Sequence, residues 1–329
     1  MWSNRIALRR SRRVAGDGTL TAMSAKPSHP HRPPTIRWGL FALLIALVTG
    51  SAVLYAQFPG GGTKGRRGGG FGGGGFGGGR GVRGQMPDRG DYPQWENPKE
   101  FDRDVFMFAR IQYDSFGGRG GGGEHWRNDF PDCDWNFSYR LQQLTALGAD
   151  PNGKVLRLTD PDLFDYPFIF MSNVQQMMLS ADEIAGLRRY LLNGGFLLAD
   201  DFWAPAAWQH VKQVMREVFP DRQTRELTLD HEIFHIVYDM KQLPQVPSIL
   251  AWQRGDRFEY WHGDPEGDEA PHFHGLFDDS GRLMALLCHN NDIGDGWERE
   301  GEDKAYFEEF SEKFSYPFGI NLITYVMTH

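Results

Sequence analysis

The pattern of apolar and polar positions is clearest between residues 166 and 203, where it predicts a βαβ unit. Residues 166–172 form a short apolar run, as expected for a strand that is buried on both faces. Ser180 and Glu183 then have the spacing of a capping box, apolar residues follow at helical intervals, and two glycines end the pattern. A second apolar run, 196–199, supplies the next strand.

Two adjacent carboxylates end this second strand, because Asp200 and Asp201 follow it directly, before Phe202 and Trp203. Ligands of parallel α/β sheets bind beyond the carboxyl ends of the strands, so this is the predicted edge of a site. Adjacent residues of a strand point to opposite faces, and we therefore expect only one of the two carboxylates to enter a cleft. The alternative is a helix cap plus one carboxylate that is solvated or paired with an arginine.

The remaining patterns extend this unit to a larger α/β domain. They predict strands at 104–113 and 154–158, helices at 135–147 and 206–218, a hairpin from 273–277 and 282–289, and C-terminal helices over 304–329 that are broken near Pro317. Three apolar strands that alternate with helical segments predict a parallel sheet with crossover helices over residues 104–202.

Composition narrows the classes of protein. The chain has 329 residues, of which 40% are hydrophobic, so it can bury a full core. The formal net charge is −8 although the N-terminal third is basic, so the folded part is more acidic still. An acidic domain argues against a reader of duplex nucleic acid. The two cysteines, Cys133 and Cys288, have no metal-type spacing and are expected to be buried free thiols.

The N-terminal part predicts export. Residues 38–55 are uncharged and follow eight Lys and Arg residues, so the positive-inside rule places the N-terminus in the cytoplasm and the domain outside. Whether the segment is a retained anchor or a cleaved signal that releases the domain to the periplasm stays open. The predicted organisation is a basic cytoplasmic leader at 1–37, a transmembrane or signal segment at 38–58, a Gly/Arg-rich disordered linker at 59–94, and an α/β domain at 95–329. The linker is expected to be a tether rather than an RNA-binding segment.

Six motifs resemble the domain of unknown function 4159 family, and they extend over nearly all of residues 104–329. They are FARIQYDS (108–115), PDCDWNFSYRLQQLT (131–145), LRLTDPDLFDYPFIFMS (156–172), LRRYLLNGGFLLADDFW (187–203), DHEIFH (230–235) and CHNNDIGDGWEREGE (288–302). That family is similar to the class I glutamine-amidotransferase-like superfamily. The resemblance implies a flavodoxin-like layered sheet with helices on both faces, and it implies no established activity.

The resemblance also implies where a nucleophile would stand. Enzymes of the superfamily place a cysteine on the turn after the strand that follows the GG-terminated helix. Asp200, Asp201 and Phe202 occupy that place here, and neither cysteine lies there. Glutamine amidotransferase activity is therefore not expected.

His231 and His235 form an H-E-x-x-H pattern, which binds zinc only when a helix brings both imidazoles to one metal. The β-branched and apolar residues around it favour an extended chain, so a metalloprotease is not expected. A separate hydrogen-bonding or ligand role for His231 is the favoured interpretation.

Polar residues at the predicted strand ends complete the candidate site. The loop from His289 to Glu298 follows an apolar strand; its oxygens could bind a hard cation, although Ca²⁺-loop spacing is missing and long turns use the same residues. Asp129, Asp132 and Asp134 are interpreted as turn and cap residues. We expect Asp200 or Asp201 within reach of His231 or His289. The full candidate set is Asp114, Asp160, Asp200, Asp201, Trp203, His231, His289, Asn290, Asp292, Asp295 and Glu298.

Three hypotheses follow for function. The first is a non-catalytic binding or complex-forming module displayed outside the membrane. The second is a carboxylate-based hydrolase acting on a carbohydrate or another envelope polymer. The third is a metal-dependent enzyme that uses Asp200 or Asp201 with His231 and His289. No cofactor is expected, although a divalent cation would suit the carboxylates. Expected partners are the membrane, through an uncleaved 38–58 segment, and other proteins, but no nucleic acid.

Overall fold

The computed structural model describes residues 86–90, 92–97, 105–116 and 124–329. The predicted leader, the hydrophobic segment and most of the predicted linker lie outside these residues. Across the described ranges, no helix has both the length and the apolar character needed to cross a membrane.

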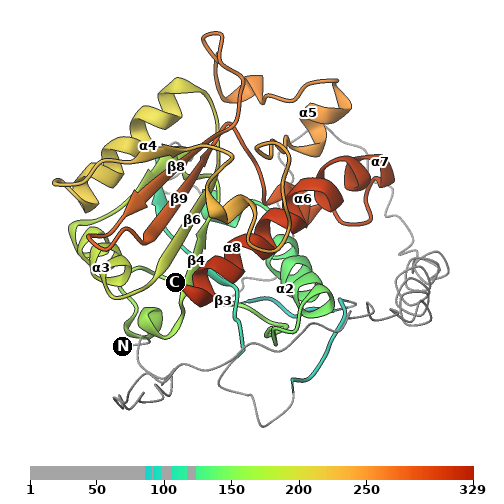
Figure 1. Ribbon diagram of the computed structural model, residues 1–329, viewed down its shortest axis with the longest axis horizontal. Coiled ribbons are helices and arrows are strands. Elements are labelled where there is room, and N and C mark those ends of the chain that lie inside the picture. Colours follow the sequence, from blue (N-terminus) through green and yellow to red (C-terminus); the bar gives the residue numbers. More distant parts are fainter. Residues whose placement is uncertain (1–85, 91, 98–104, 117–123) are drawn as a thin grey trace, which may run out of the picture. The chain divides into compact units, whose positions relative to one another are not determined.

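A seven-stranded sheet forms the centre of the domain, with the order β3-β1-β4-β6-β9-β8-β7 (Figure 1). Its strands are β1 (Ala109–Ile111), β3 (Lys154–Leu156), β4 (Phe168–Met171), β6 (Phe196–Phe202), β7 (Arg225–Leu227), β8 (His272–Phe277) and β9 (Leu283–His289). The first five strands in this spatial order are parallel, whereas β8 and β7 extend the sheet as antiparallel strands.

The strand order agrees with the predicted fold class. Numbered along the chain, the five parallel strands have the order 2-1-3-4-5, which is the order of flavodoxin-like sheets. The α/β architecture is therefore compatible with a flavodoxin-like fold. The predicted parallel pairing of the βαβ unit is confirmed, because Phe168 pairs with Phe196 and Met171 with Ala199 in parallel register. The β8–β9 hairpin is confirmed as well.

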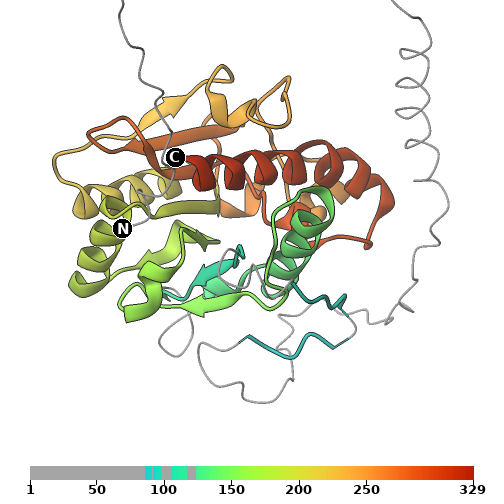
Figure 2. The same ribbon diagram turned by 60° about the horizontal axis from the view of Figure 1, so that its bottom comes forward.

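Helices cover both faces of the sheet. The long helices are α2 (Asp132–Leu144), α3 (Ala181–Leu192), α4 (Ala204–Val218) and α8 (Tyr316–Thr328). Figures 1 and 2 show α3 and α4 on one face and α2 beside α8 on the other. The side chains of β4 alternate between these two faces. Phe168 and Phe170 pack in the core with α2 and α8. Ile169 and Met171 pack on the opposite face with α3 and α4.

Short elements connect these layers. They are β2 (Asp114–Ser115), η3 (His125–Arg127), η4 (Pro161–Asp165), η5 (Val174–Gln176), β5 (Met177–Met178), η6 (Glu232–Phe234), α5 (Ile249–Gln253), η7 (Tyr260–His262), α6 (Asp295–Glu298), α7 (Lys304–Tyr306) and the π-helix η8 (Phe307–Ser315). The strands β2 and β5 pair as a separate antiparallel ribbon.

The helix signals of the sequence have mixed outcomes. The capping box of α3 is confirmed, because the Glu183 amide donates to Ser180 Oγ and the Ser180 amide donates to Glu183 Oε2. The predicted break near Pro317 is wrong, since α7, η8 and α8 follow one another without interruption. Pro317 lies in the first turn of α8, where a missing N–H is tolerated.

We expect Gly186→Ala to destabilise the domain, even though alanine favours a helix interior by about 1 kcal/mol. A Cβ at this position would lie 2.1 Å from the carbonyl oxygen of Leu158, so α3 would have to move away from the sheet. Overpacking of this kind costs about 1–3 kcal/mol. Denaturant unfolding measures the difference, with Ala185→Gly at the exposed neighbouring position as the control. A more stable Gly186→Ala protein would contradict the close packing of α3.

Candidate functional site

Asp200 and Asp201 lie near the end of β6, just before its last residue Phe202, and both are buried, with 0% and 2% of their surface exposed. The register between β6 and β9 shifts between Ala199 and Phe202, and Asp201 has a left-handed backbone with φ 54°. This irregularity breaks the alternation of side chains along the strand. Of the two carboxylates only Asp201 belongs to a group of neighbouring donor atoms, and the alternative of a helix cap plus a solvated carboxylate is wrong, because both side chains are buried and neither caps α4.

Two side chains orient the Asp201 carboxylate. Asn128 Nδ2 donates to its Oδ2 at 2.7 Å, and Trp203 Nε1 donates to its Oδ1 at 3.2 Å. The Trp203 side chain is fully buried and packs edge-on against Phe258. Each carboxylate oxygen keeps a lone pair after these hydrogen bonds, so Asp201 is held in place and can still bind a ligand.

The Asp200 carboxylate is only half satisfied. Its Oδ2 accepts a hydrogen bond from the Gly294 amide at 2.9 Å. Its Oδ1 is buried and has no hydrogen-bond partner among the described residues. Buried polar atoms are nearly always paired, so this oxygen marks a place where something else interacts with the protein.

Arg110 fixes the loop that follows β1. Its guanidinium pairs with Asp134 in α2 inside the core, with Nε 2.9 Å from Oδ1, and it donates to the carbonyls of Trp126 and Asn128. The same loop carries Asp129, whose Oδ2 accepts from Ser172 Oγ at 3.2 Å, directly after β4. The loops of β1 and β4 thus meet at the point where the strand order reverses, the usual place of ligands in such sheets.

The loop after β9 closes over this edge, and its asparagines hold the backbone. Asn290 Oδ1 accepts from the Ala204 amide, and Asn291 Oδ1 accepts from the Val246 amide. Asp292 is buried, and its Oδ1 accepts from the Asp295 amide at 2.9 Å. The predicted loop therefore lines the site through Asp292, while its two asparagines have a structural role.

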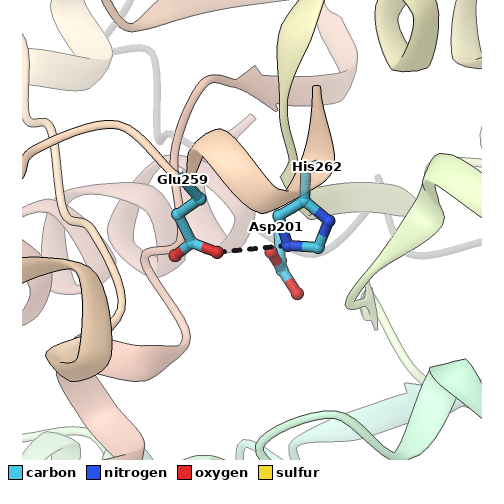
Figure 3. A group of neighbouring side chains, drawn as sticks. All are labelled: Asp201, Glu259 and His262. Atoms are coloured by element: carbon cyan, nitrogen blue, oxygen red, sulfur yellow. Dashed lines mark ion pairs between the residues drawn. The ribbon is translucent and has the colours of Figure 1, made fainter. Parts of the chain in front are cut away.

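Glu259 and His262 approach the site from η7, a segment that sequence reasoning missed. Glu259 Oε1 accepts from the Ser248 amide at 2.7 Å, and Oε2 lies 3.1 Å from His262 Nε2. Figure 3 shows both side chains turned toward Asp201. The available signal was their E-x-x-H spacing, which places two metal-binding side chains on one side of a helical turn.

Three groups of donor atoms lie close enough to share a cation, each with its atoms within 4.8 Å of one another. They are Asp201 with Glu259 and His262, Asp129 with Asp201 and Asp292, and Asp129 with Asp295 and Glu298. In the third group Asp295 and Glu298 already form ion pairs with Arg299, and Asp295 also accepts from the Ile249 amide. Among the described residues no Lys or Arg forms an ion pair with a member of the first two groups, and within the first group Glu259 lies 3.1 Å from His262.

Burial dominates the electrostatics of the site. Desolvation, together with nearby carboxylates such as Asp295, raises the pKa of Asp129 to about 7 against the lowering effect of Arg110. Burial likewise holds the pKa values of Asp200, Asp201 and Asp292 well above the usual range. Without a cation, these carboxyl groups retain protons near neutral pH because several like charges cannot ionise together in the interior.

Asp114 and Asp160 lie apart from this cluster. Asp114 is exposed and pairs with Arg157, which also contacts Glu183. Asp160 accepts a hydrogen bond from the Arg157 amide and precedes η4. Both follow strands of the predicted edge, but their oxygens are used by arginine and by the backbone.

His231 lies at the other end of the sheet. Its ring packs 6.2 Å from Phe277, which pairs with Leu283 at the beginning of β9. The H-E-x-x-H segment forms the 3-10 turn η6 instead of a helix, and His235 bonds to Asp239 and to the Leu229 carbonyl. Its two imidazoles therefore do not form a zincin site.

His289 is at the site edge but is used in packing. Its Nε2 lies 3.0 Å from the Ala204 carbonyl oxygen, and its ring stacks on Phe202. Burial lowers its pKa to about 4. Within the described residues neither Asp200 nor Asp201 has a hydrogen bond or ion pair to His231 or His289, and the histidine grouped with Asp201 is His262.

A cavity of about 350 Å³ lies elsewhere, between α4 and the strands β7 and β8. Its lining includes Trp208, Lys212, Arg216 and His274. One carboxylate, Glu226, contributes to the lining, and it is paired with His272. The cavity offers no group of oxygen donors, so the candidate site is placed at the buried carboxylates.

We expect the metal-free protein to lose stability between pH 6.5 and pH 8. The folded pKa of Asp129, about 7, exceeds its usual value of 3.8, so the folded state binds more protons than the unfolded state and stability falls as pH rises. Asp129 alone contributes a loss of about 1 kcal/mol over this window. The lowered pKa values of His274 and His289, about 4, act in the opposite direction, mostly below pH 6.5, and offset part of this loss just above it.

Denaturant unfolding with a chelator at the two pH values measures this loss. Asp129→Asn should flatten the dependence, and Asp165→Asn at an exposed position is the matched control. Stability that stays constant or rises over the window would contradict the buried carboxyl cluster.

Comparison with known proteins identifies the family of this chain but assigns no activity to it. No curated protein matches the chain. The family model described as "Domain of unknown function (DUF4159)" matches residues 107–327, which include every residue of the buried cluster. The chain belongs to this family of unknown function.

Proposed function

We propose that this domain binds a divalent metal ion through Asp201, Glu259 and His262. The observation that carries the proposal is the approach of their donor atoms to within 4.8 Å of one another at the carboxyl edge of the sheet. One imidazole with two carboxylates suits Mn²⁺, Fe²⁺, Co²⁺ or Zn²⁺ better than Ca²⁺, which prefers oxygen ligands alone.

Access to this metal site would come from the side of His262. Its side chain is 19% exposed, whereas that of Glu259 is 3% exposed. Glu259 is anchored from behind by the Ser248 amide, and His262 Nδ1 is held 2.7 Å from Gln175 Nε2. These contacts fix the orientation of the ligands, as outer partners do in known metal centres.

A second candidate function is metal-dependent hydrolysis. The observation that favours it is the number of protein ligands, since three ligands leave coordination positions for water or substrate, as in catalytic centres. A binding module needs no such open position. The first proposal therefore concerns metal binding alone. Hydrolysis is the activity that a metal ion bound at the same site would support.

We also propose that the fold belongs to the glutamine-amidotransferase-like superfamily without its chemistry. The 2-1-3-4-5 order of the parallel strands supports the first part. Asp201 stands where the nucleophilic cysteine would be expected. Cys133 in α2 and Cys288 in β9 are both fully buried, and burial raises the pKa of each thiol well above its usual value.

The proposed setting is outside the cytoplasmic membrane, either anchored through residues 38–58 or released to the periplasm. Eight basic residues before the uncharged segment 38–55 support this orientation. There the domain would act as a metal-dependent binding module or enzyme of the cell envelope, with protein partners as further components.

Replacement of one ligand tests the metal proposal. The purified full-length chain should bind Mn²⁺ or Zn²⁺ in calorimetric titration, and His262→Gln should weaken that binding by at least about tenfold. His235→Gln is the matched control, because His235 bonds to Asp239 and Leu229 away from the site. Equal binding by wild-type protein and His262→Gln would show that His262 is not a ligand.

Topology has a separate test. A reporter enzyme that folds only in the cytoplasm, fused after residue 329, should be inactive, whereas a periplasmic reporter at the same place should be active. The opposite result would contradict export and leave the metal proposal unaffected.

A further inference from the structure

We infer that a second divalent cation binds deeper in the domain, between the carboxylates of Asp129, Asp201 and Asp292, so that Asp201 bridges two metal ions. The inference rests on the proposed function only through Asp201, which the two groups share. It assigns an inner site with oxygen ligands alone, next to the outer site that includes His262.

Two loops and the end of one strand deliver the inner ligands from distant parts of the chain. Asp129 comes from the loop after β1, Asp201 from the end of β6, and Asp292 from the loop after β9. All three side chains are buried, and their oxygens lie within 4.8 Å of one another. A compact group of carboxylate oxygens is the ligand set that Mg²⁺, Mn²⁺ and Ca²⁺ prefer.

Each inner ligand is held by a hydrogen bond that leaves other lone pairs open. Asp129 Oδ2 accepts from Ser172 Oγ, and Asp292 Oδ1 accepts from the Asp295 amide. Asp201 accepts one hydrogen bond at each oxygen. An ionised carboxylate offers about four lone-pair positions. The one or two hydrogen bonds that each of these carboxylates accepts therefore leave positions free for a metal ion.

An independent observation points to a ligand at the same place. Asp200 Oδ1 is fully buried and has no hydrogen-bond partner within the described part of the chain, while its Oδ2 accepts from the Gly294 amide. A Cβ added to Gly294 would lie 2.8 Å from Asp129 Oδ2 and 3.5 Å from Asp292 Oδ1, so the residue that binds the Asp200 carboxylate adjoins two of the inner ligands. A cation, or a water bound to it, would give this oxygen the partner that the protein does not supply.

Local cations do not balance these charges. Arg110 is committed to Asp134, and Arg299 to Asp295, Glu298 and Glu302. In the part of the chain that the structure describes, no Lys or Arg forms an ion pair with Asp129, Asp200, Asp201 or Asp292. Buried carboxylates are stable when they are paired or coordinate a metal, and a divalent cation supplies the missing charge.

Asparagine variants can remove the inner site alone. Asp129 has φ 61°, a conformation that asparagine tolerates, and an asparagine at 292 keeps an oxygen to accept from the Asp295 amide. The full-length chain, dialysed against Mn²⁺ at pH 8, should contain two Mn²⁺ per molecule by metal analysis. Asp292→Asn and Asp129→Asn should each contain one, His262→Gln one, and the exposed control Asp165→Asn two.

The two proposals fail in different ways. If wild-type protein holds one Mn²⁺ that His262→Gln loses and Asp292→Asn keeps, the inner site does not exist and the outer site stands. If wild-type protein holds one Mn²⁺ that Asp292→Asn loses and His262→Gln keeps, the inner site stands alone. Absence of Mn²⁺ from wild-type protein overturns both.

Loss of the fold is excluded by a second measurement. Thermal unfolding with a chelator at pH 8 should show Asp129→Asn and Asp292→Asn at least as stable as wild-type protein, because each replaces a buried carboxyl group, costly to ionise beside other carboxylates, with a neutral amide. Added Mn²⁺ should raise the melting temperature of wild-type protein more than that of either variant. Equal rises in all three proteins would contradict the inner site.

Discussion

The domain depends on one electrostatic constraint: carboxylates from two loops and from the end of β6 are buried together, and the described residues offer too few cations to balance them. Arg110 compensates Asp134, and Arg299 compensates acidic residues of α6. Asp129, Asp200, Asp201 and Asp292 remain without an ion pair among the described residues. Either protons or bound cations must supply the missing charge, and the two choices have different consequences for stability and function. In the proposed metal sites, bound cations supply this charge.

The fold places this constraint at the edge where flavodoxin-like sheets bind ligands. Asp129 follows β1, Asp200 and Asp201 lie near the end of β6, and Asp292 follows β9. Several residues there have left-handed backbones, including Asp129, Asp201 and Asn290, and Asp and Asn adopt this conformation at lower cost than most residues. Hydrogen bonds from Asn128, Ser172 and Trp203 hold the carboxylates in the resulting positions. The strained backbone is thus concentrated where the proposed ligands lie.

Local signals were enough to predict the sheet and part of the site. The capping box at Ser180 and the apolar run before Asp200 depend on neighbours in the sequence, and both are confirmed. The burial of both Asp200 and Asp201 depends on a bulge against β9 that no local pattern announces. Glu259 and His262 reach Asp201 through a long connection with weak secondary-structure patterns, so their role follows only from tertiary packing. Asp129 was interpreted as an ordinary turn residue. Its position depends on Arg110, which binds the neighbouring Asn128 carbonyl from a strand that was expected to be apolar, and no local pattern reveals this contact.

The most direct test of the central claim is a crystal structure of the full-length chain grown with Mn²⁺ above pH 7, with anomalous scattering recorded at the manganese edge. The proposed role of Asp201 predicts one anomalous peak between Asp201, Glu259 and His262 and a second between Asp129, Asp201 and Asp292. A map without an anomalous peak at Asp201 would contradict it, and would show that protons alone keep these carboxylates in the interior.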